Sequence, residues 1–176
     1  MVRRNLLRSA AALLAFTLTA VGAQVITPTT ASAAPASTAA VRTIYYDASR
    51  AGQFVQTVHD AANVWNQHVT NIRLVPGSPA SIVAYVDNGW PRAYPGALGS
   101  GRFYMGMQAI NQGHYPLRIA THEIGHLLGL PDRRTGLCTD LMSGSSAPAS
   151  CRNPNPSARE AAEVQAKFAR GYAPVG

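Results

Sequence analysis

Residues 122–132 of the chain read HEIGHLLGLPD, which is the pattern H-E-x-x-H followed by x-x-G-x-x-D. On a helix, His122 and His126 project from the same face because they are four residues apart, so both imidazoles can bind one metal ion. Gly129 has no Cβ and can adopt the left-handed conformation that ends a helix. The chain can then turn back and present Asp132 as a third ligand. Two nitrogens and one carboxylate oxygen leave a fourth position open for water, which is the arrangement of a catalytic zinc site.

Glu123 follows the first predicted ligand, where its carboxylate can reach a water on the metal without binding the metal itself. Zinc lowers the pKa of such a water towards neutrality, and Glu123 is the predicted base that accepts its proton and delivers it to the leaving amine. The alternative interpretation is an amphipathic core helix that carries two surface histidines. A chain with this His and Glu content would contain H-E-x-x-H by chance in roughly two or three cases in a thousand.

The segment from His122 to Asp132 resembles the metzincin zinc-binding signature, in a form whose third ligand is Asp. In that form it is similar to the snapalysin family of small secreted bacterial zinc endopeptidases. Residues 141–144 (LMSG) match the position of the methionine turn that lies below the metal in this clan. Cys138 and Cys151 flank that turn as the family's disulfide pair does. The resemblance covers about residues 41–172.

The resemblance implies that Met142 packs beneath the metal as an apolar floor. It also implies one zinc ion per chain and protein or peptide substrates that lie extended beside the edge strand of the sheet. By position we expect that edge near residues 102–108, where main-chain pairing would bind peptides with little demand on their side chains. A preference for an aromatic residue on the amine side of the cut is implied as well.

Two positions depart from the family's pattern. Snapalysins carry a Tyr two residues after the Asp ligand, and this chain has Arg134 there. We weigh two roles for Arg134: a catalytic residue that donates to the oxyanion in place of the Tyr, or a solvent-exposed side chain beside Arg133 on a flexible loop. The family's calcium-binding Asp and Thr align with Tyr115 and Leu117, whose side chains do not supply the required ligands, so we do not expect calcium at that place.

The chain has two cysteines, Cys138 and Cys151, and in an exported protein a disulfide between them is the default expectation. Closing a loop of that length stabilises a fold by about 3 kcal/mol. The alternative, a pair of zinc ligands, lacks a nearby His or a second Cys at the usual spacing.

The first 40 residues are predicted to lie outside the folded domain. Arginines precede a short apolar run at residues 10–20, and residues 21–23 (VGA) are small, so residues 1–23 are predicted to be a signal peptide. Residues 24–40 are rich in Ala, Thr, Ser and Pro, carry no charge, and are predicted to be a short disordered pro-segment or linker. We therefore expect a secreted protein without a membrane-spanning segment. Residues 1–40 contain no Cys, His, Asp or Glu that could bind the metal and block it. A separate secreted inhibitor protein is therefore one candidate for control of the activity.

Residues 41–176 are predicted to be one zinc metalloprotease domain, and we expect it to be a monomer. This part keeps twelve basic and all eight acidic residues, a net charge of +4. The basic residues are scattered and do not alternate with aromatic residues, so a nucleic-acid-binding protein is not expected.

Hydrophobic periodicity and turn residues predict the elements of this domain. Strands are expected at residues 41–46, 71–75, 81–86 and 102–108, helices at 49–68, 116–128 and 157–169, and irregular chain at 87–101 and 130–156. Ser49 is the predicted cap of the first helix, and Ser157 and Glu160 form a predicted capping box at the start of the last. This order predicts an α+β fold, a single metzincin-like domain with a twisted mixed sheet, an active-site helix and a C-terminal helix.

Three functions remain open. The leading hypothesis is an extracellular zinc endopeptidase. The second is a catalytically silent, zinc-stabilised secreted binding module, which Arg134 keeps open although an intact Glu123 argues against it. The third is a basic protein that adheres to anionic cell-wall polymers. Of the other histidines, His59 and His68 are expected to be solvated or edge residues, and His114 could line a cleft.

Overall fold

The computed structural model of the chain describes residues 41–170, so the predictions for residues 1–23 and 24–40 lie outside the described residues. None of the helices within that range combines the length and the apolar character that crossing a membrane requires.

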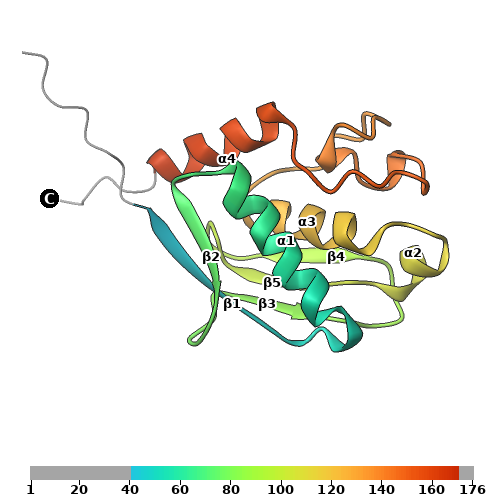
Figure 1. Cartoon of the computed structure of the whole chain (residues 1–176), viewed down its shortest axis with the longest axis horizontal. Helices are drawn as coiled ribbons and strands as arrows, with labels where there is room; N and C mark the ends of the chain where they lie inside the picture. Colours follow the sequence, from blue (N-terminus) through green and yellow to red (C-terminus); the bar gives the residue numbers. More distant parts are fainter. Residues whose placement is uncertain (1–40, 171–176) are drawn as a thin grey trace, which may run out of the picture. The chain divides into compact units, whose positions relative to one another are not determined.

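Five strands form one mixed sheet in the order β2-β1-β3-β5-β4 (Figure 1). The strands are β1 (Arg42–Arg50), β2 (Ile72–Pro76), β3 (Ile82–Tyr85), β4 (Arg92–Pro95) and β5 (Gly101–Tyr104). Strand β1 runs parallel to β2 and β3, and β3 runs parallel to β5, whereas β4 pairs antiparallel with β5. The predicted α+β fold with a mixed sheet is confirmed.

The helices are α1 (Val55–His68), the short α2 (Met107–Asn111), α3 (Pro116–Leu127) and α4 (Ala158–Arg170), with 3-10 turns η1 (Gly52–Phe54) and η2 (Leu141–Ser146). Helices α1 and α3 lie on one face of the sheet. Helix α1 packs on β1 and β2, and α3 packs on β4 and β5 (Figure 1). The fully buried Trp65 joins the two helices, because its indole N–H donates to Thr121 O at 2.9 Å.

The opposite face of the sheet carries a row of stacked side chains. The strand register places Arg50, Tyr85, Tyr104 and Arg92 side by side across four strands. The two tyrosine rings stack with centroids 5.1 Å apart, and the guanidinium carbons of Arg50 and Arg92 lie 5.6 and 4.1 Å from their centroids. Each cation–π contact at an exposed site is worth about 0.5–1 kcal/mol, so the row stabilises the sheet face that lies away from α1 and α3.

The prediction of irregular chain throughout residues 87–101 is wrong, because it contains β4. Its terminal Pro95 is tolerated because an edge strand has no second neighbour that needs its N–H. The predicted edge near residues 102–108 is therefore wrong as well, since β5 lies between β3 and β4. The chain leaves the sheet at Gly106, which has φ +60 and where a Cβ would come within 2.2 Å of Pro91 N, and it continues as α2.

Ser49 does not cap the first helix, contrary to prediction. Strand β1 continues to Arg50 across an irregularity in its pairing with β3, and the Ser49 N–H donates to Asp47 Oδ1 at 2.8 Å. Pairing between strands overrides the local capping signal, and the helix begins only at Val55. The capping box at the last helix is present, since the Glu160 N–H donates to Ser157 Oγ and Glu160 Oε2 accepts the Ser157 N–H.

Cys138 and Cys151 form the expected disulfide, with Cα atoms 5.6 Å apart. Replacing Cys138 by Ser is expected to lower the free energy of unfolding by about 3 kcal/mol, because the bridge closes the loop that contains η2. Thermal unfolding of the variant and of the Cys138→Ser/Cys151→Ser double variant measures this, and the two should melt at the same temperature. Two reactive thiols per chain in the unfolded, unreduced wild-type protein would rule the bridge out.

Candidate metal centre

Helix α3 carries the two histidines of the predicted metal site. It begins at Pro116, whose ring suits the first helical position, and its buried side includes Ala120, Ile124 and Leu127. His122 and His126 lie one turn apart at the edge of this buried side, with side chains 12% and 20% exposed. The helix therefore fixes both imidazoles between the core and the solvent.

Gly129 ends this helix as predicted. It has φ +92, and the Leu130 N–H donates to Gly125 O at 2.9 Å. The chain then reverses and brings Asp132 back to the two histidines. A side chain at Gly129 would be strained by this φ and would also place a Cβ 2.9 Å from Lys167 Cδ.

The three ligand atoms lie at nearly equal distances from one another. The Nε2 atoms of His122 and His126 are 3.1 Å apart, and Asp132 Oδ1 lies 3.3 and 3.5 Å from them. Zinc bonds of about 2.0–2.1 Å in a tetrahedron place neighbouring ligand atoms about 3.3 Å apart. The donor set therefore fits zinc, with one tetrahedral position left over.

The second ring nitrogen of each histidine is held by a main-chain carbonyl. His122 Nδ1 lies 3.0 Å from Leu141 O, and His126 Nδ1 lies 2.8 Å from Leu130 O. A carbonyl only accepts, so each Nδ1 carries the proton and each Nε2 keeps its lone pair. These contacts turn both Nε2 atoms towards Asp132.

Arg134 contacts the third predicted ligand. Its guanidinium donates to Asp132 Oδ2 at 3.1 Å although its side chain is 66% exposed, and its backbone has φ +51. The neighbouring Arg133 is anchored instead of flexible, because its N–H donates to Met142 O at 2.7 Å and its side chain pairs with Glu163. Arg134 is thus mostly exposed to solvent and makes one hydrogen bond to Asp132, while the residue before it is anchored.

Glu123 lies against the same site with its carboxyl group buried. It is 4% exposed, and its Oε2 has no hydrogen-bond partner within residues 41–170. Burial raises the pKa of Glu123 to about 7. A buried carboxylate oxygen without a partner, next to predicted metal ligands, is suited to exchanging a proton with a bound molecule.

Met142 is fully buried under α3. A Cβ on Gly125 would lie 2.8 Å from Met142 Sδ and 3.2 Å from Trp65 Cζ2, so the glycine before His126 makes room for the methionine. The main chain of η2 also comes close to the ligands at Gly144, where a Cβ would lie 3.3 Å from Asp132 Oδ1. The predicted floor is therefore in contact with the helix that carries the histidines.

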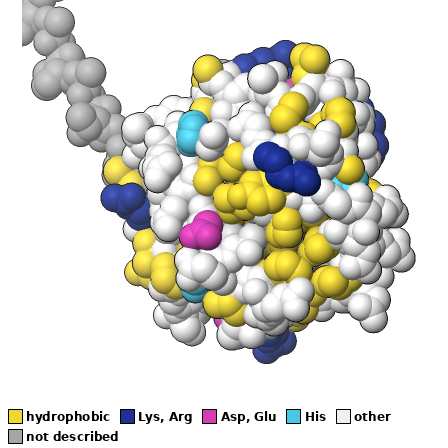
Figure 2. All heavy atoms as spheres, turned by 45° about the vertical axis from the view of Figure 1, so that its right-hand side comes forward, with side chains coloured by type: hydrophobic (Ala, Val, Ile, Leu, Met, Phe, Trp, Pro, Cys, Tyr) yellow, Lys and Arg dark blue, Asp and Glu magenta, His cyan; other side chains and the backbone are white. Residues whose placement is uncertain are grey.

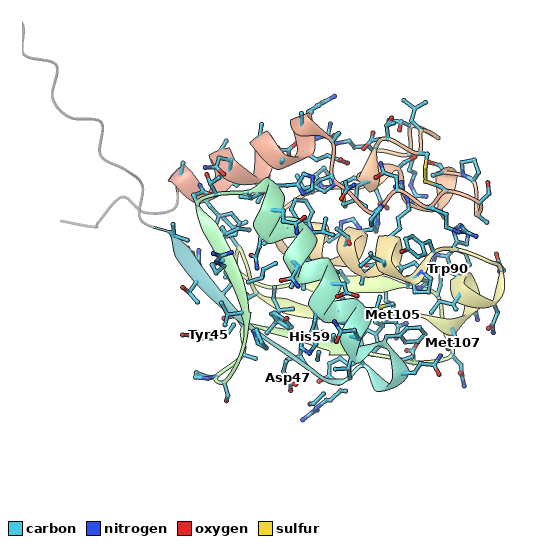
Figure 3. The ribbon with its side chains drawn as sticks, in the orientation of Figure 1. Tyr45, Asp47, His59, Trp90, Met105 and Met107 are labelled. Atoms are coloured by element: carbon cyan, nitrogen blue, oxygen red, sulfur yellow. A yellow bond between two sulfur atoms is a disulfide. The ribbon has the colours of Figure 1, made fainter. Side chains whose placement is uncertain are left out.

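A cavity of about 350 Å³ opens beside these residues. Besides the predicted ligands, Glu123 and Arg134, its lining comes from β4, α2, the start of α3 and η2: Trp90, Pro91, Arg92, Ala93, Pro95, Ala109, His114, Tyr115, Arg118, Ile119, Gly144 and Ser145. The rings of Trp90 and His114 meet edge to face, with centroids 5.9 Å apart. Figure 3 shows Trp90 close to α2, whereas His59 lies on α1.

Of the other predictions, His114 does line the cavity, but His59 and His68 do not. The Tyr46 hydroxyl lies 2.7 Å from His59 Nδ1, and His68 Nδ1 lies 2.8 Å from Val64 O. Trp90 and Tyr115 were not predicted as cavity residues. An exposed Trp in a segment rich in Gly and Pro was the available signal for Trp90.

The charge around the site is mixed. Figure 2 shows hydrophobic side chains gathered over the middle of one face, with one Lys or Arg side chain lying across them and others lying singly near the margins. Arg92 borders the cavity but is held by Asp87, to which its guanidinium donates two hydrogen bonds.

Comparison with known proteins found similar sequences. A sequence model of the Streptomyces extracellular neutral proteinase (M7) family matches residues 40–171. An extracellular small neutral protease from Streptomyces caespitosus is 40% identical over 130 residues, which cover 73% of this chain and 98% of that protein. A protein of the same name from Streptomyces lividans is 37% identical over 80% of this chain and 63% of its own length.

A solved structure of high choriolytic enzyme 1, a hatching-enzyme zinc-protease from medaka fish (Oryzias latipes), is 23% identical. The match covers 66% of this chain and 60% of that one, with a TM-score of 0.41. A likeness of this size carries no inference about function.

Proposed function

The chain belongs to the Streptomyces extracellular neutral proteinase (M7) family, the snapalysin family that its metal motif resembles, and from this we propose that His122, His126 and Asp132 hold one zinc ion for peptide hydrolysis. The protein is a secreted metalloprotease. The alignment spans nearly the whole of one relative and about three fifths of another, so its substrates are a proposal.

The observation that supports this proposal best is the arrangement of three candidate ligand atoms beside the buried carboxylate of Glu123, whose Oε2 has no hydrogen-bond partner among residues 41–170. When bound, zinc would polarise the scissile carbonyl and lower the pKa of a bound water. Glu123 would take the proton of the attacking water and return it to the leaving amine, a role that its place in the cavity lining and its partnerless Oε2 among residues 41–170 support. The Leu141 and Leu130 carbonyls keep the histidine rings oriented during this exchange.

We infer that the substrate main chain lies along the open edge of β4. The Gly96 N–H donates to Ser100 O, and hydrogen-bonded pairs alternate along an antiparallel ladder, so the N–H and C=O of Ala93 face away from β5. Ala93 also lines the cavity. An extended peptide can pair with these groups and bring its scissile bond to the metal without side-chain recognition.

The aromatic preference on the amine side of the cut is also a proposal. The wall of the cavity includes Trp90, Tyr115, His114 and Ile119, of which Trp90 and His114 are in contact, and these residues offer apolar and aromatic surface to a ring. Aromatic pairs at ring separations of 4.5–7 Å add about 0.5–1.5 kcal/mol to their burial. Such a wall favours Phe or Tyr over small or charged side chains.

The test is a digest of an unfolded protein such as casein by the purified mature enzyme, with the products identified by mass spectrometry. Internal cuts with Phe, Tyr or Trp enriched after the cleaved bond are expected, and Trp90→Ala should weaken that enrichment while cleavage continues. Protein that holds zinc but produces no cuts would favour the second candidate, a silent zinc-stabilised binding module.

Arg134 is proposed as a catalytic residue that donates to the oxyanion. One of its donors is engaged by Asp132, and a guanidinium has five N–H groups, so donors remain for a substrate oxygen at the cavity. Arg134→Ala is expected to lower turnover by about a hundredfold with zinc content unchanged. Steady-state kinetics and metal analysis measure this, with Arg73→Ala as the control, because Arg73 is an exposed arginine on β2 outside the cavity lining. A fall smaller than about threefold would mean that zinc alone stabilises the oxyanion.

Three further expectations stay predictions. They are a monomeric state, control by a separate inhibitor protein, and no calcium requirement at Tyr115 and Leu117. For calcium the check is a melting temperature that changes little when calcium is added to zinc-saturated protein.

A further inference from the structure

The loop that contains Met142 is held by two buried charged side chains from different helices. Glu160 of α4 is fully buried. Its carboxylate accepts the N–H of Met142 at 2.7 Å and the N–H of Leu141 at 3.2 Å, in addition to the N–H and hydroxyl of Ser157. Two of its four donors therefore belong to η2 and not to its own helix.

Arg118 of α3 binds the carbonyl groups of the same loop. It is 7% exposed, and its Nη1 donates to Cys138 O and Asn153 O while its Nη2 donates to Asp140 O at 2.7 Å and Leu141 O at 3.4 Å. The N–H of Leu141 is thus bound by Glu160 and its C=O by Arg118. Each end of this residue's backbone has a charged partner.

Leu141 O is also the acceptor for His122 Nδ1, at 3.0 Å. Arg118 and His122 are four residues apart on α3, so both side chains reach the same carbonyl from one face of the helix. The position of this single oxygen therefore determines where the His122 ring points.

We propose that Glu160 and Arg118 are positioning residues of the metal centre. Together they fix Leu141 so that its carbonyl holds the Nδ1 proton of His122 and turns Nε2 towards the other ligands. This inference rests on the proposed function, because it takes His122 as a zinc ligand. Outer partners of metal-bound histidines change metal affinity by about 10- to 100-fold when they are removed.

The experiment compares Glu160→Gln with Ser157→Ala in the mature protein. Gln keeps the size of the side chain but turns an acceptor into a donor against the η2 amides. Ser157→Ala removes the helix cap and one Glu160 contact, but it leaves the Leu141 and Met142 bonds intact. Both should lower the melting temperature. The zinc dissociation constant separates a positioning role from a purely stabilising one. It is measured by competition with a chromophoric chelator, at a temperature where both variants are folded.

Glu160→Gln is expected to weaken zinc binding about tenfold or more, and Ser157→Ala to stay within about threefold of wild type. Equal zinc affinity in Glu160→Gln and wild type overturns the proposal. If wild type itself binds no zinc, the proposed function fails instead. If Glu160→Gln does not fold, Arg118→Lys replaces it in the experiment, because Lys keeps the charge but cannot bridge several carbonyls. Arg118→Lys is expected to show the same loss of zinc affinity. An affinity equal to that of wild type overturns the proposal.

An NMR spectrum of the zinc-loaded wild-type protein gives a test that needs no variant. Long-range proton–nitrogen correlation should show His122 protonated at Nδ1. An unprotonated Nδ1 overturns the proposal, because the Leu141 carbonyl would then not be holding the ring.

Discussion

Replacing Glu123 by Gln is expected to lower the turnover number for peptide hydrolysis by about 10²- to 10⁴-fold, with fold and zinc content unchanged. Gln has nearly the same shape and keeps an oxygen beside the cavity, but it cannot accept a proton. Glu123 Oε2 has no hydrogen-bond partner within residues 41–170, so the substitution breaks no observed contact of that atom. The loss should therefore appear in turnover and not in stability.

Asp60→Asn is the matched control for this change. Asp60 is an exposed carboxylate on α1 whose partner is Gln56, and it lies outside the cavity lining. Its conversion to an amide should leave turnover within about twofold of wild type, as expected for a surface site. If Glu123→Gln retains more than about a tenth of wild-type turnover, another group carries the proton and the assignment of Glu123 is wrong.

The close approach of the three candidate ligands could be predicted from the sequence because these residues lie within eleven positions of one another. Helical spacing fixes His122 relative to His126, and one glycine turn returns Asp132. Local rules of this kind need no knowledge of the rest of the fold. The disulfide could be predicted for a similar reason, since only one pairing exists.

The edge strand could not be predicted because β4 is a strand only as a result of its pairing with β5, and not because of its own composition. Its residues Arg92–Pro95 lie in a segment dense in Gly and Pro, and pairing with β5 overrides that composition. Ser49 failed in the same way, since pairing between β1 and β3 extends the strand past a capping signal. In both cases contacts between distant residues outweighed the local pattern.

The side chains that support the site could be predicted only in part from the sequence. Glu160 was predicted as a capping residue, which it is, but its bonds to Leu141 and Met142 link residues 18 and 19 positions apart. Arg118 was not singled out at all, because its partners are main-chain carbonyls, which have no signature in sequence. Arg134 was weighed as donor or as solvated residue, and its contact with Asp132 depends on a backbone φ of +51 that spacing does not reveal.

Removing zinc is expected to abolish hydrolysis, with a loss of more than about 99% of the activity. The three proposed ligands leave a fourth position for water, so the proposed reaction depends on the ion. The melting temperature should fall as well, since an ion that binds only the folded state stabilises it. Adding zinc back should restore both properties, and circular dichroism of the metal-free protein separates loss of the ion from loss of the fold.

Metal analysis of the purified mature protein, combined with casein cleavage before and after a strong chelator, tests the central claim most directly. About one equivalent of zinc per chain is predicted, with cleavage lost on chelation and regained with zinc. Protein that carries less than about a tenth of an equivalent of zinc and still cleaves casein at full rate would contradict the metalloprotease assignment.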